Sequence, residues 1–130
     1  SGVTLSCSGP QAEQMLDGMN IDVAIMAVSG YSFNGGFTSG SLQEAQLKQQ
    51  VIRKAACTMM LMDCGKIGRS HPFTFASLDD VDVLVGDNML PSEFLKEAEA
   101  HNVCVFSGND GLTPEKRSAI MKELFARKYR

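Results

Sequence analysis

Four apolar runs of strand length, separated by stretches with helical periodicity, most constrain the fold of this chain. The runs are DVAIMAV at 22–28, CTMMLMD at 57–63, VDVLVGD at 81–87 and VCVF at 103–106. Continuous apolar runs are typical of strands covered on both faces, as in parallel sheets. Strands that alternate with helices are joined by right-handed crossovers. The sequence therefore predicts an α/β fold: an open, mostly parallel, Rossmann-like sheet with helices on both faces.

Helical patterns fill the spaces between these runs. They are QAEQMLDGM after Gly9-Pro10, SLQEAQLKQQVIRKAA at 41–56, PSEFLKEAEAHN at 91–102, and a final segment that begins at Thr113-Pro114. We expect Ser41 to be an N-cap, because its hydroxyl can accept a hydrogen bond from an amide of the first turn. Proline is favoured in a first helical turn, which supports the start of the last helix.

Composition limits the class of protein. The 130 residues suit one domain with one core, and 44% hydrophobic and 21% charged residues are ordinary for a globular protein. A formal net charge of −3 argues against DNA binding by this chain itself. No apolar run approaches the roughly 20 residues needed to span a bilayer. We therefore expect no membrane partner and no signal peptide.

The four cysteines form no CxxC pair; they are Cys7, Cys57, Cys64 and Cys104. Cys57 and Cys104 fall within apolar runs, where a small buried thiol fits. This usage favours a reduced, cytoplasmic protein without structural zinc. We expect neither a metal nor a cofactor.

Polar and glycine-rich segments follow the predicted strands, at 29–38, 63–69, 86–90 and 107–111. In open parallel sheets, ligands bind beyond the carboxyl ends of the strands, where these segments should meet. The first, SGYSFNGGFT, has a permissive backbone that would let amides approach a phosphate closely. It matches neither GxGxxG nor the P-loop pattern, so a merely flexible connection is an equal alternative.

Two charged residues interrupt the apolar stripe of the second predicted helix. Glu44 and Lys48 lie one turn apart on the face that also carries Leu47 and Val51. A stripe that becomes ionic toward the strand ends indicates an inward-facing polar pocket. The alternative is a solvated i,i+4 ion pair, worth about 0.2–0.5 kcal/mol.

The turn DCGKIGR after the second strand adds further charge. Lys66 could meet a phosphate as a point charge, and Asp63 could accept hydrogen bonds from sugar hydroxyls. The alternative is a turn in which Asp63 caps the backbone and Lys66 is solvated. LDDVD, at 78–82, reads as a polar loop rather than a metal site. The basic residues of the last helix are expected to form a solvated face: Lys116, Arg117, Lys122, Arg127, Lys128 and Arg130.

In their order and spacing, these features resemble the C-terminal sensor half of DeoR-family transcriptional repressors. The resemblance covers residue 9 to about residue 106. The matching positions are Gly9-Pro10, Asp22, Ser29-Gly30 with Gly36 and Thr38, Glu44-Ala45 with Lys48, then Asp63, Lys66, Gly68, Phe75, Leu78, Val81 and Asp82.

The resemblance implies a fold shared with ribose-5-phosphate isomerase, glucosamine-6-phosphate deaminase and CoA transferases. It also implies a phosphorylated sugar or polyol as effector, and assembly as a homo-oligomer. In the family, the effector alters the binding of an N-terminal winged helix-turn-helix domain to operator DNA. The pocket residues carried over by the resemblance are Ser29, Gly30, Gly35, Gly36, Thr38, Glu44, Lys48, Asp63 and Lys66.

Two departures from the family pattern qualify this expectation. Residues 1–130 are expected to form a single but partial effector-sensing domain, without the DNA-binding domain and without the first strand and loop of the sensor. The turn that often reads D-S-S-K reads Asp63-Cys64-Gly65-Lys66 here, which removes a hydrogen-bonding serine.

A sensor is expected rather than an enzyme. The related isomerases carry proton-transferring acids after the strand that precedes the flexible loop, and VSGY at 28–31 contains none. A sugar-phosphate isomerase or deaminase, and a ligand-free oligomerisation module, are the alternatives.

Overall fold

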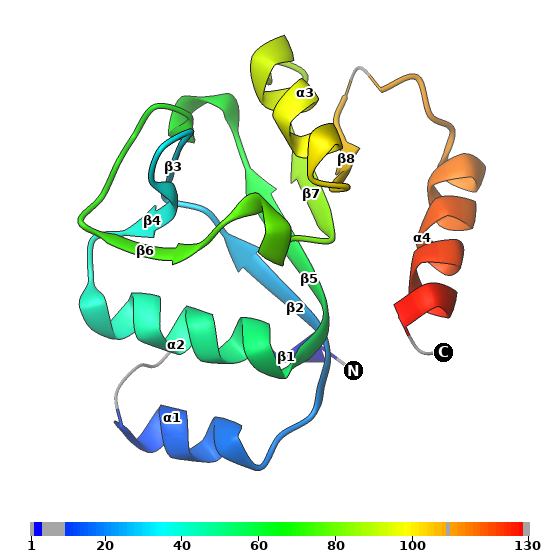
Figure 1. Ribbon diagram of the computed structural model, residues 1–130. Helices are drawn as coiled ribbons and strands as arrows, with labels where there is room; N and C mark the ends of the chain where they lie inside the picture. Colours follow the sequence, from blue (N-terminus) through cyan, green and yellow to red (C-terminus); the bar gives the residue numbers. More distant parts are fainter. Residues whose placement is uncertain (1, 4–9, 109, 129–130) are drawn as a thin grey trace.

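A parallel sheet of five strands organises the computed structural model (Figure 1), which describes residues 2–3, 10–108 and 110–128. The strand order is β1-β2-β5-β7-β8, and every neighbouring pair is parallel. The bounds are β1 Gly2–Val3, β2 Ile21–Ala27, β5 Ala55–Met62, β7 Val83–Gly86 and β8 Cys104–Phe106. The predicted α/β class is thus confirmed. β1 was not predicted, because two residues are too few to produce a pattern.

Helices cover both faces of this sheet, as the sequence predicts. Three helices share one face and its core cluster, and the last helix lies on the other (Figure 1). Their bounds are α1 Pro10–Asp17, α2 Leu42–Lys54, α3 Ser92–Ala100 and α4 Pro114–Lys128. The predicted start at Gly9-Pro10 is described from Pro10 only, because Gly9 lies outside the described residues, as does Cys7.

The start of α2 follows its sequence, whereas its end does not. The amide of Glu44 donates to the Ser41 hydroxyl oxygen at 3.3 Å, so the predicted N-cap is confirmed. The helix was expected to reach residue 56 but ends at Lys54, and Ala55 is already extended. Ala55 pairs with Ile21 of β2. Sheet pairing therefore overrides the helical propensity of alanine.

A second, antiparallel sheet of three strands lies beside the first, in the order β3-β4-β6. Its strands are β3 Gly30–Ser32, β4 Gly36–Ser39 and β6 Phe73–Ala76. The expectation that 29–38 is a loop is therefore wrong: most of this segment is a β-hairpin. This sheet contains three buried aromatic residues, Tyr31, Phe37 and Phe75. The Tyr31 ring also packs against the Phe94 ring of α3, with 5.1 Å between the ring centroids. Aromatic burial holds a segment whose composition suggested flexibility.

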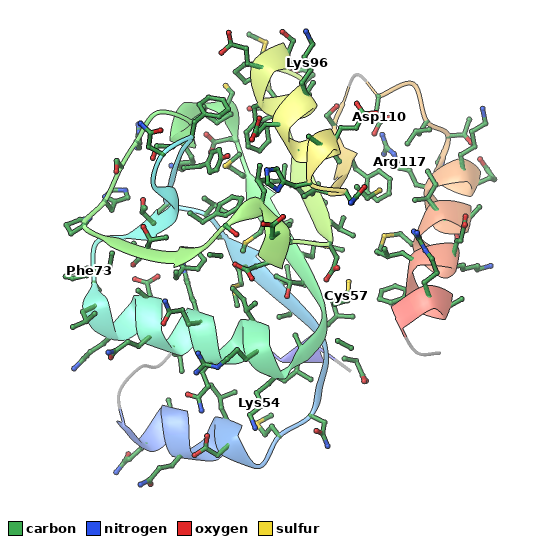
Figure 2. All side chains as sticks on the ribbon, viewed as in Figure 1. Lys54, Cys57, Phe73, Lys96, Asp110 and Arg117 are labelled. Atoms are coloured by element: carbon green, nitrogen blue, oxygen red, sulfur yellow. The ribbon has the colours of Figure 1, made fainter. Side chains whose placement is uncertain are left out.

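The two faces of the main sheet differ in how completely they are covered. On the face covered by α1–α3, Leu16 of α1 and Phe94 of α3 are completely buried. On the opposite face, Cys57 points toward the α4 side of the sheet (Figure 2) and is buried, as expected for a strand thiol. Farther along this face, Ile25 is 54% exposed and Leu61 is 43% exposed. None of the described helices is long and apolar enough to cross a membrane.

Candidate functional site

The carboxyl ends of four neighbouring parallel strands meet along one edge of the main sheet. β2 ends at Ala27, β5 at Met62, β7 at Gly86 and β8 at Phe106. The segments predicted to face a ligand, 29–38, 63–69, 86–90 and 107–111, follow these four strands (residue 109 is outside the described part). This edge is where open parallel sheets bind ligands.

The glycines of the hairpin have packing roles. A Cβ atom on Gly30 would approach the backbone oxygen of Arg69 to 2.6 Å. Gly36 has a φ of +69°, and a Cβ atom there would approach the backbone oxygen of Ala76 to 2.5 Å. Both positions exclude a larger residue because the backbone is too close. The permissive composition of this segment therefore serves the hairpin itself.

Gly35 and Thr38 are also held within the small sheet. The Gly35 amide donates to the Ser32 hydroxyl oxygen at 2.9 Å, and its carbonyl accepts from the Thr74 hydroxyl at 2.7 Å. Thr38 is buried, and its hydroxyl oxygen accepts from the His71 amide at 2.9 Å. The hydrogen bonds of these two residues thus stabilise the hairpin.

His71 covers the start of the hairpin. Its Nε2 atom lies 3.2 Å from the backbone oxygen of Ser29, which is exposed at the end of the β2 segment. Its Cδ2 atom would lie 2.8 Å from a Cβ atom on Gly30. Sequence reasoning gave His71 no role, because a single histidine in an irregular stretch carries no pattern.

Glu44 and Lys48 form an ion pair whose two ends differ in burial. The Lys48 Nζ atom lies 3.1 Å from Glu44 Oε1 and donates to the carbonyl of Ala27, the last residue of β2, at 3.3 Å. It also lies 4.8 Å from the centroid of the Phe75 ring. The Lys48 side chain is 16% exposed, whereas that of Glu44 is 48% exposed. Lysine therefore faces inward, as the pocket hypothesis requires, and glutamate stays at the surface.

The charge of this pair is internally compensated. The hydrogen bond from Lys48 lowers the pKa of Glu44, the charge of Lys48 lowers it further, and the Ser39 hydroxyl contributes to a smaller extent. Glu44 is therefore ionised at neutral pH and neutralises Lys48. An anionic ligand at this position has to compete with the Glu44 carboxylate or share Lys48 with it.

The turn after β5 contains both Asp63 and Lys66, which have different roles. Asp63 Oδ1 accepts the Gly65 amide at 2.9 Å and caps a short 3₁₀ turn, Cys64–Lys66. Among the described residues, no ion pair or hydrogen bond engages the partly buried Lys66 ammonium group. The turn joins the hairpin through the Gly68 amide, which donates to the Tyr31 carbonyl at 2.7 Å.

Asp87 connects this turn to the end of β7. Its Oδ2 accepts the Cys64 amide at 3.0 Å, and its Oδ1 accepts the Met89 amide at 3.0 Å. These backbone hydrogen bonds, that of Cys64 first, lower the pKa of Asp87. The sequence identified this loop but not Asp87, because the contact depends on two strands becoming neighbours.

The edge of the sheet therefore presents cations and acceptors together. Lys48 of α2 reaches the carbonyl of Ala27 at the end of β2, and Lys66 lies in the turn after β5, the neighbouring strand. Glu44 and Asp63 supply carboxylate oxygens. Such a combination suits a ligand that carries both phosphate and hydroxyl groups. Within the part of the chain that the structure describes, no three His, Cys, Asp or Glu side chains are grouped to hold a metal ion.

Comparison with known proteins bears on the same region. The sequence model of the family described as "DeoR C terminal sensor domain" matches residues 2–88. All nine residues carried over from the resemblance fall inside this range, and α4 lies beyond it.

Several regulators are similar to this chain. It is 30% identical to the HTH-type transcriptional regulator GlpR of Haloferax volcanii over 105 residues, which are 81% of this chain and 41% of that protein. It is 30% identical to the HTH-type transcriptional regulator IolR of Bacillus subtilis over 100 residues, 77% of this chain and 40% of that protein. It is 24% identical to the deoxyribose operon repressor of Escherichia coli K12 over 91 residues, which are 70% of this chain and 36% of that protein. The chain thus spans about two fifths of the length of these relatives.

Proposed function

Because this chain belongs to the family of DeoR C-terminal sensor domains, we propose that it is the effector-binding part of a transcriptional repressor. Its effector is a phosphorylated sugar or polyol. The names of its relatives support a sugar-related effector: one is a deoxyribose operon repressor and another is an L-fucose operon activator.

The observation that carries this proposal is the position of the Lys48 ammonium group on the carbonyl of Ala27, which ends β2, with Lys66 in the turn that follows the adjacent strand β5. In the proposed complex, the phosphate group contacts Lys66, whose ammonium group is not engaged among the described residues. Glu44, half exposed, and Asp63 Oδ2 accept hydrogen bonds from the hydroxyl groups. Ser29 is an exposed residue just after the end of β2.

Operator binding and self-association complete the proposed function. The net charge of −3 favours DNA contact through a helix-turn-helix domain outside these 130 residues. Parallel sheets are usually covered on both faces, and exposed Ile25 and Leu61 therefore support assembly into a homo-oligomer.

We propose further that the chain has no isomerase or deaminase activity. No carboxylate occurs at 28–31, and Glu44 has its charge committed to Lys48. A proton transfer from carbon needs a base within hydrogen-bond reach of the substrate. Turnover of ribose 5-phosphate or glucosamine 6-phosphate that is abolished in Glu44→Gln would contradict this part of the proposal.

Paired thermal-shift measurements test the ligand class. Each sugar or polyol is compared with its own phosphate ester, so that only the phosphate differs within a pair. A ligand at 100 times its dissociation constant should stabilise the domain by about 2.7 kcal/mol. We expect one phosphate ester to do so and its parent alcohol not to. Equal stabilisation by both members of every pair, or by neither, contradicts the proposal.

A further inference from the structure

The face of the main sheet on which α4 lies is apolar along all four long strands. Side chains of a strand alternate between the two faces of a sheet. The pairing register places on this face Val23, Ile25 and Ala27 of β2, Cys57, Met59 and Leu61 of β5, Val83 and Val85 of β7, and Cys104 and Phe106 of β8. None of these side chains is charged. Parallel sheets with such faces are normally covered by helices on both sides.

α4 covers only one part of this apolar face (Figure 1). Cys57 and Val83 are buried in the cluster against which α4 packs. Toward the carboxyl ends of β2 and β5 the face is uncovered, because Ile25 is 54% exposed, Leu61 is 43% exposed and Ala27 is exposed as well. Ala27 pairs with Leu61, so these three residues lie on neighbouring strands. We name Ile25, Ala27 and Leu61 the apolar strip.

α4 itself has more apolar surface than its contact with the sheet hides. Four of its apolar residues follow the i, i+4 spacing of one helix side and pack against the sheet, yet each remains partly exposed: Ile120, Met121, Leu124 and Phe125. The basic residues Lys122 and Arg127 are exposed, as expected from the sequence. The helix therefore keeps apolar surface available for a second contact.

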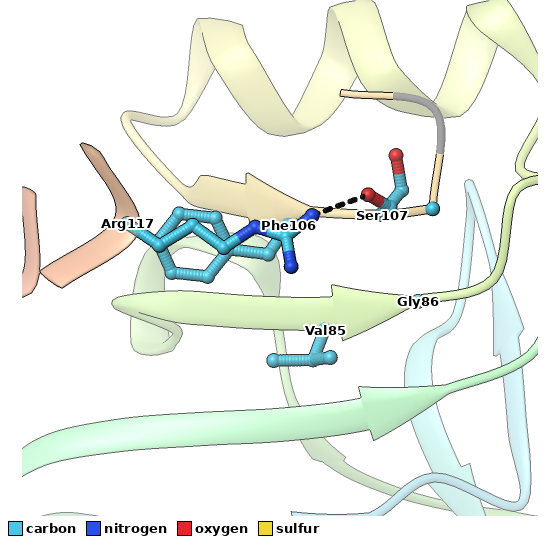
Figure 3. Close-up of a pocket in the computed structure, with 6 residues that line it drawn as sticks. Val85, Gly86, Phe106, Ser107 and Arg117 are labelled. Atoms are coloured by element: carbon cyan, nitrogen blue, oxygen red, sulfur yellow. Dashed lines mark hydrogen bonds between the residues drawn. The ribbon is translucent and has the colours of Figure 1, made fainter. Parts of the chain in front are cut away.

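Arg117 ties the start of α4 to the loop after β8. Its Nη2 atom donates to the Ser107 carbonyl at 3.2 Å (Figure 3) and to Asp110 Oδ1 at 2.9 Å. The expectation that Arg117 belongs to a solvated basic face is therefore wrong: the side chain is paired, although it remains 41% exposed. These contacts hold α4 at the β8 side of the sheet, away from the apolar strip on β2 and β5.

The uncovered part of the sheet has the width of one helix. Neighbouring strands lie about 4.8 Å apart and packed helices about 8–10 Å apart, so one helix covers about two strands. The apolar strip occupies two neighbouring strands, β2 and β5. A rotation by 180° about a line parallel to α4, between the helix and the strip, places the α4 of each copy over the strip of the other. Because the strip is uncharged, this pairing of identical surfaces brings no like charges together there.

We propose that two copies of this chain form a two-fold dimer in which the α4 of each copy packs on the apolar strip of the other. This inference rests on the homo-oligomer of the proposed function and assigns its surface. Helix-turn-helix regulators bind two operator half-sites as dimers whose two-fold symmetry matches that of the operator. Relatives of this chain are named HTH-type transcriptional regulators, which favours a second copy over an unrelated protein as the occupant of the strip.

Analytical ultracentrifugation of the 130-residue chain over a range of concentrations tests the dimer. Leu61→Glu puts a charge into the strip, whereas Leu42→Glu puts the same charge at a leucine of similar exposure on α2, 51% against 43%. Because an unpaired buried charge is strongly unfavourable, Leu61→Glu should raise the dimer dissociation constant by about a hundredfold or more. Ile25→Glu should act in the same way, and Leu42→Glu should leave the constant unchanged. Melting curves by circular dichroism check that each variant folds.

The outcomes separate this inference from the proposed function. A chain that stays monomeric at every concentration overturns both the α4 arrangement and the proposed self-association. An oligomer that neither strip variant weakens, or that Leu42→Glu weakens equally, overturns the arrangement alone. Nitrogen-15 NMR at several concentrations reports on α4: the amides of residues 120–125 should shift together with those of Ile25 and Leu61. Concentration-dependent shifts that leave out α4 or the strip contradict the packing of one on the other.

Discussion

Lys48 and Arg117 occupy similar positions on opposite faces of the sheet. Each is a cation held by one carboxylate and by the carbonyl of a residue at or just beyond a strand end. Lys48 contacts Glu44 and the carbonyl of Ala27. Arg117 contacts Asp110 and the carbonyl of Ser107. In both cases the neighbouring acid compensates the charge.

The two cations differ in how many of their donors are used. A lysine ammonium group has three N–H bonds, and Lys48 has three partners: a carboxylate, a carbonyl and the Phe75 ring. Arg117 has five N–H bonds, and its buried Nε is without a partner in the described residues. A ligand at Lys48 therefore has to displace or share an existing contact, whereas Arg117 carries a buried donor whose hydrogen bond is not made.

The largest effect is expected beneath Lys48, where Phe75 is buried in the small sheet. Phe75→Ala should lower the free energy of unfolding by about 3–5 kcal/mol, because it leaves a cavity between the small sheet and α2. Urea denaturation measures this change. Phe33→Ala, at a half-exposed position of the same hairpin, is the control; it removes only an edge-on contact with the Tyr31 ring and should cost about 0.5–1.5 kcal/mol. Similar losses in both variants would mean that the small sheet is not a packed unit.

The next effect concerns binding rather than stability. Lys66→Ala should weaken the binding of the phosphorylated effector by about 1.5–3 kcal/mol, the range for a hydrogen bond to a charged group. Folding should be retained, because no described residue pairs with the Lys66 side chain. Calorimetric titration of Lys66→Ala beside Lys122→Ala separates a specific contact from a general loss of positive charge. Equal affinities in the two variants would show that Lys66 is a solvated turn residue.

A matched pair of substitutions compares the two cations directly. Lys48→Met keeps the packing against Phe75 and removes the ion pair, which should cost about 0.5–1.5 kcal/mol. Arg117→Met should cost more, because it removes the cation from an Asp110 side chain that is 12% exposed, whereas that of Glu44 is 48% exposed. Chemical denaturation of both variants measures which loses more free energy of unfolding. A larger loss in Lys48→Met than in Arg117→Met would contradict the prediction.

The smallest effect is expected at His101, a cation that can be switched off by pH. Hydrogen bonding to Asp79 at 2.6 Å is the main cause that raises the pKa of His101, and Glu97 contributes as well. A raised pKa in the folded state means that the stabilisation is complete below the ordinary value of about 6.5 and is lost as the pH rises through the higher folded pKa. The effect is small because Asp79 and Glu97 are both well exposed.

Thermal melts of the unaltered chain and of His101→Gln across this pH range test the sign. The two melting temperatures should differ in mildly acidic solution and converge in alkaline solution. A difference that grows with rising pH would contradict the assignment.

Much of the main sheet could be predicted from the sequence, because each of its long strands carries a local signal. The runs at 22–28, 57–63, 81–87 and 103–106 became β2, β5, β7 and β8, and their loops lie along one edge. The short sheet was missed. β6 (Phe73–Ala76) forms a strand only because it pairs with β4, and its sequence alone does not predict this. The turn Phe33-Asn34-Gly35 was interpreted as part of a flexible loop rather than as the turn of a hairpin.

The fold class, the family and the segments at the carboxyl edge follow from the order of residues, because apolar periodicity, turn residues and motif order are local properties of a chain. The contacts that these residues make there follow from the folded structure alone. It turned Lys48 inward onto a strand-end carbonyl, placed Gly30 and Gly36 against neighbouring backbone, and paired Arg117 with Asp110 and the Ser107 carbonyl. These outcomes depend on contacts between segments far apart in sequence, and burial and hydrogen bonding at such contacts, rather than residue type, set the role of each side chain.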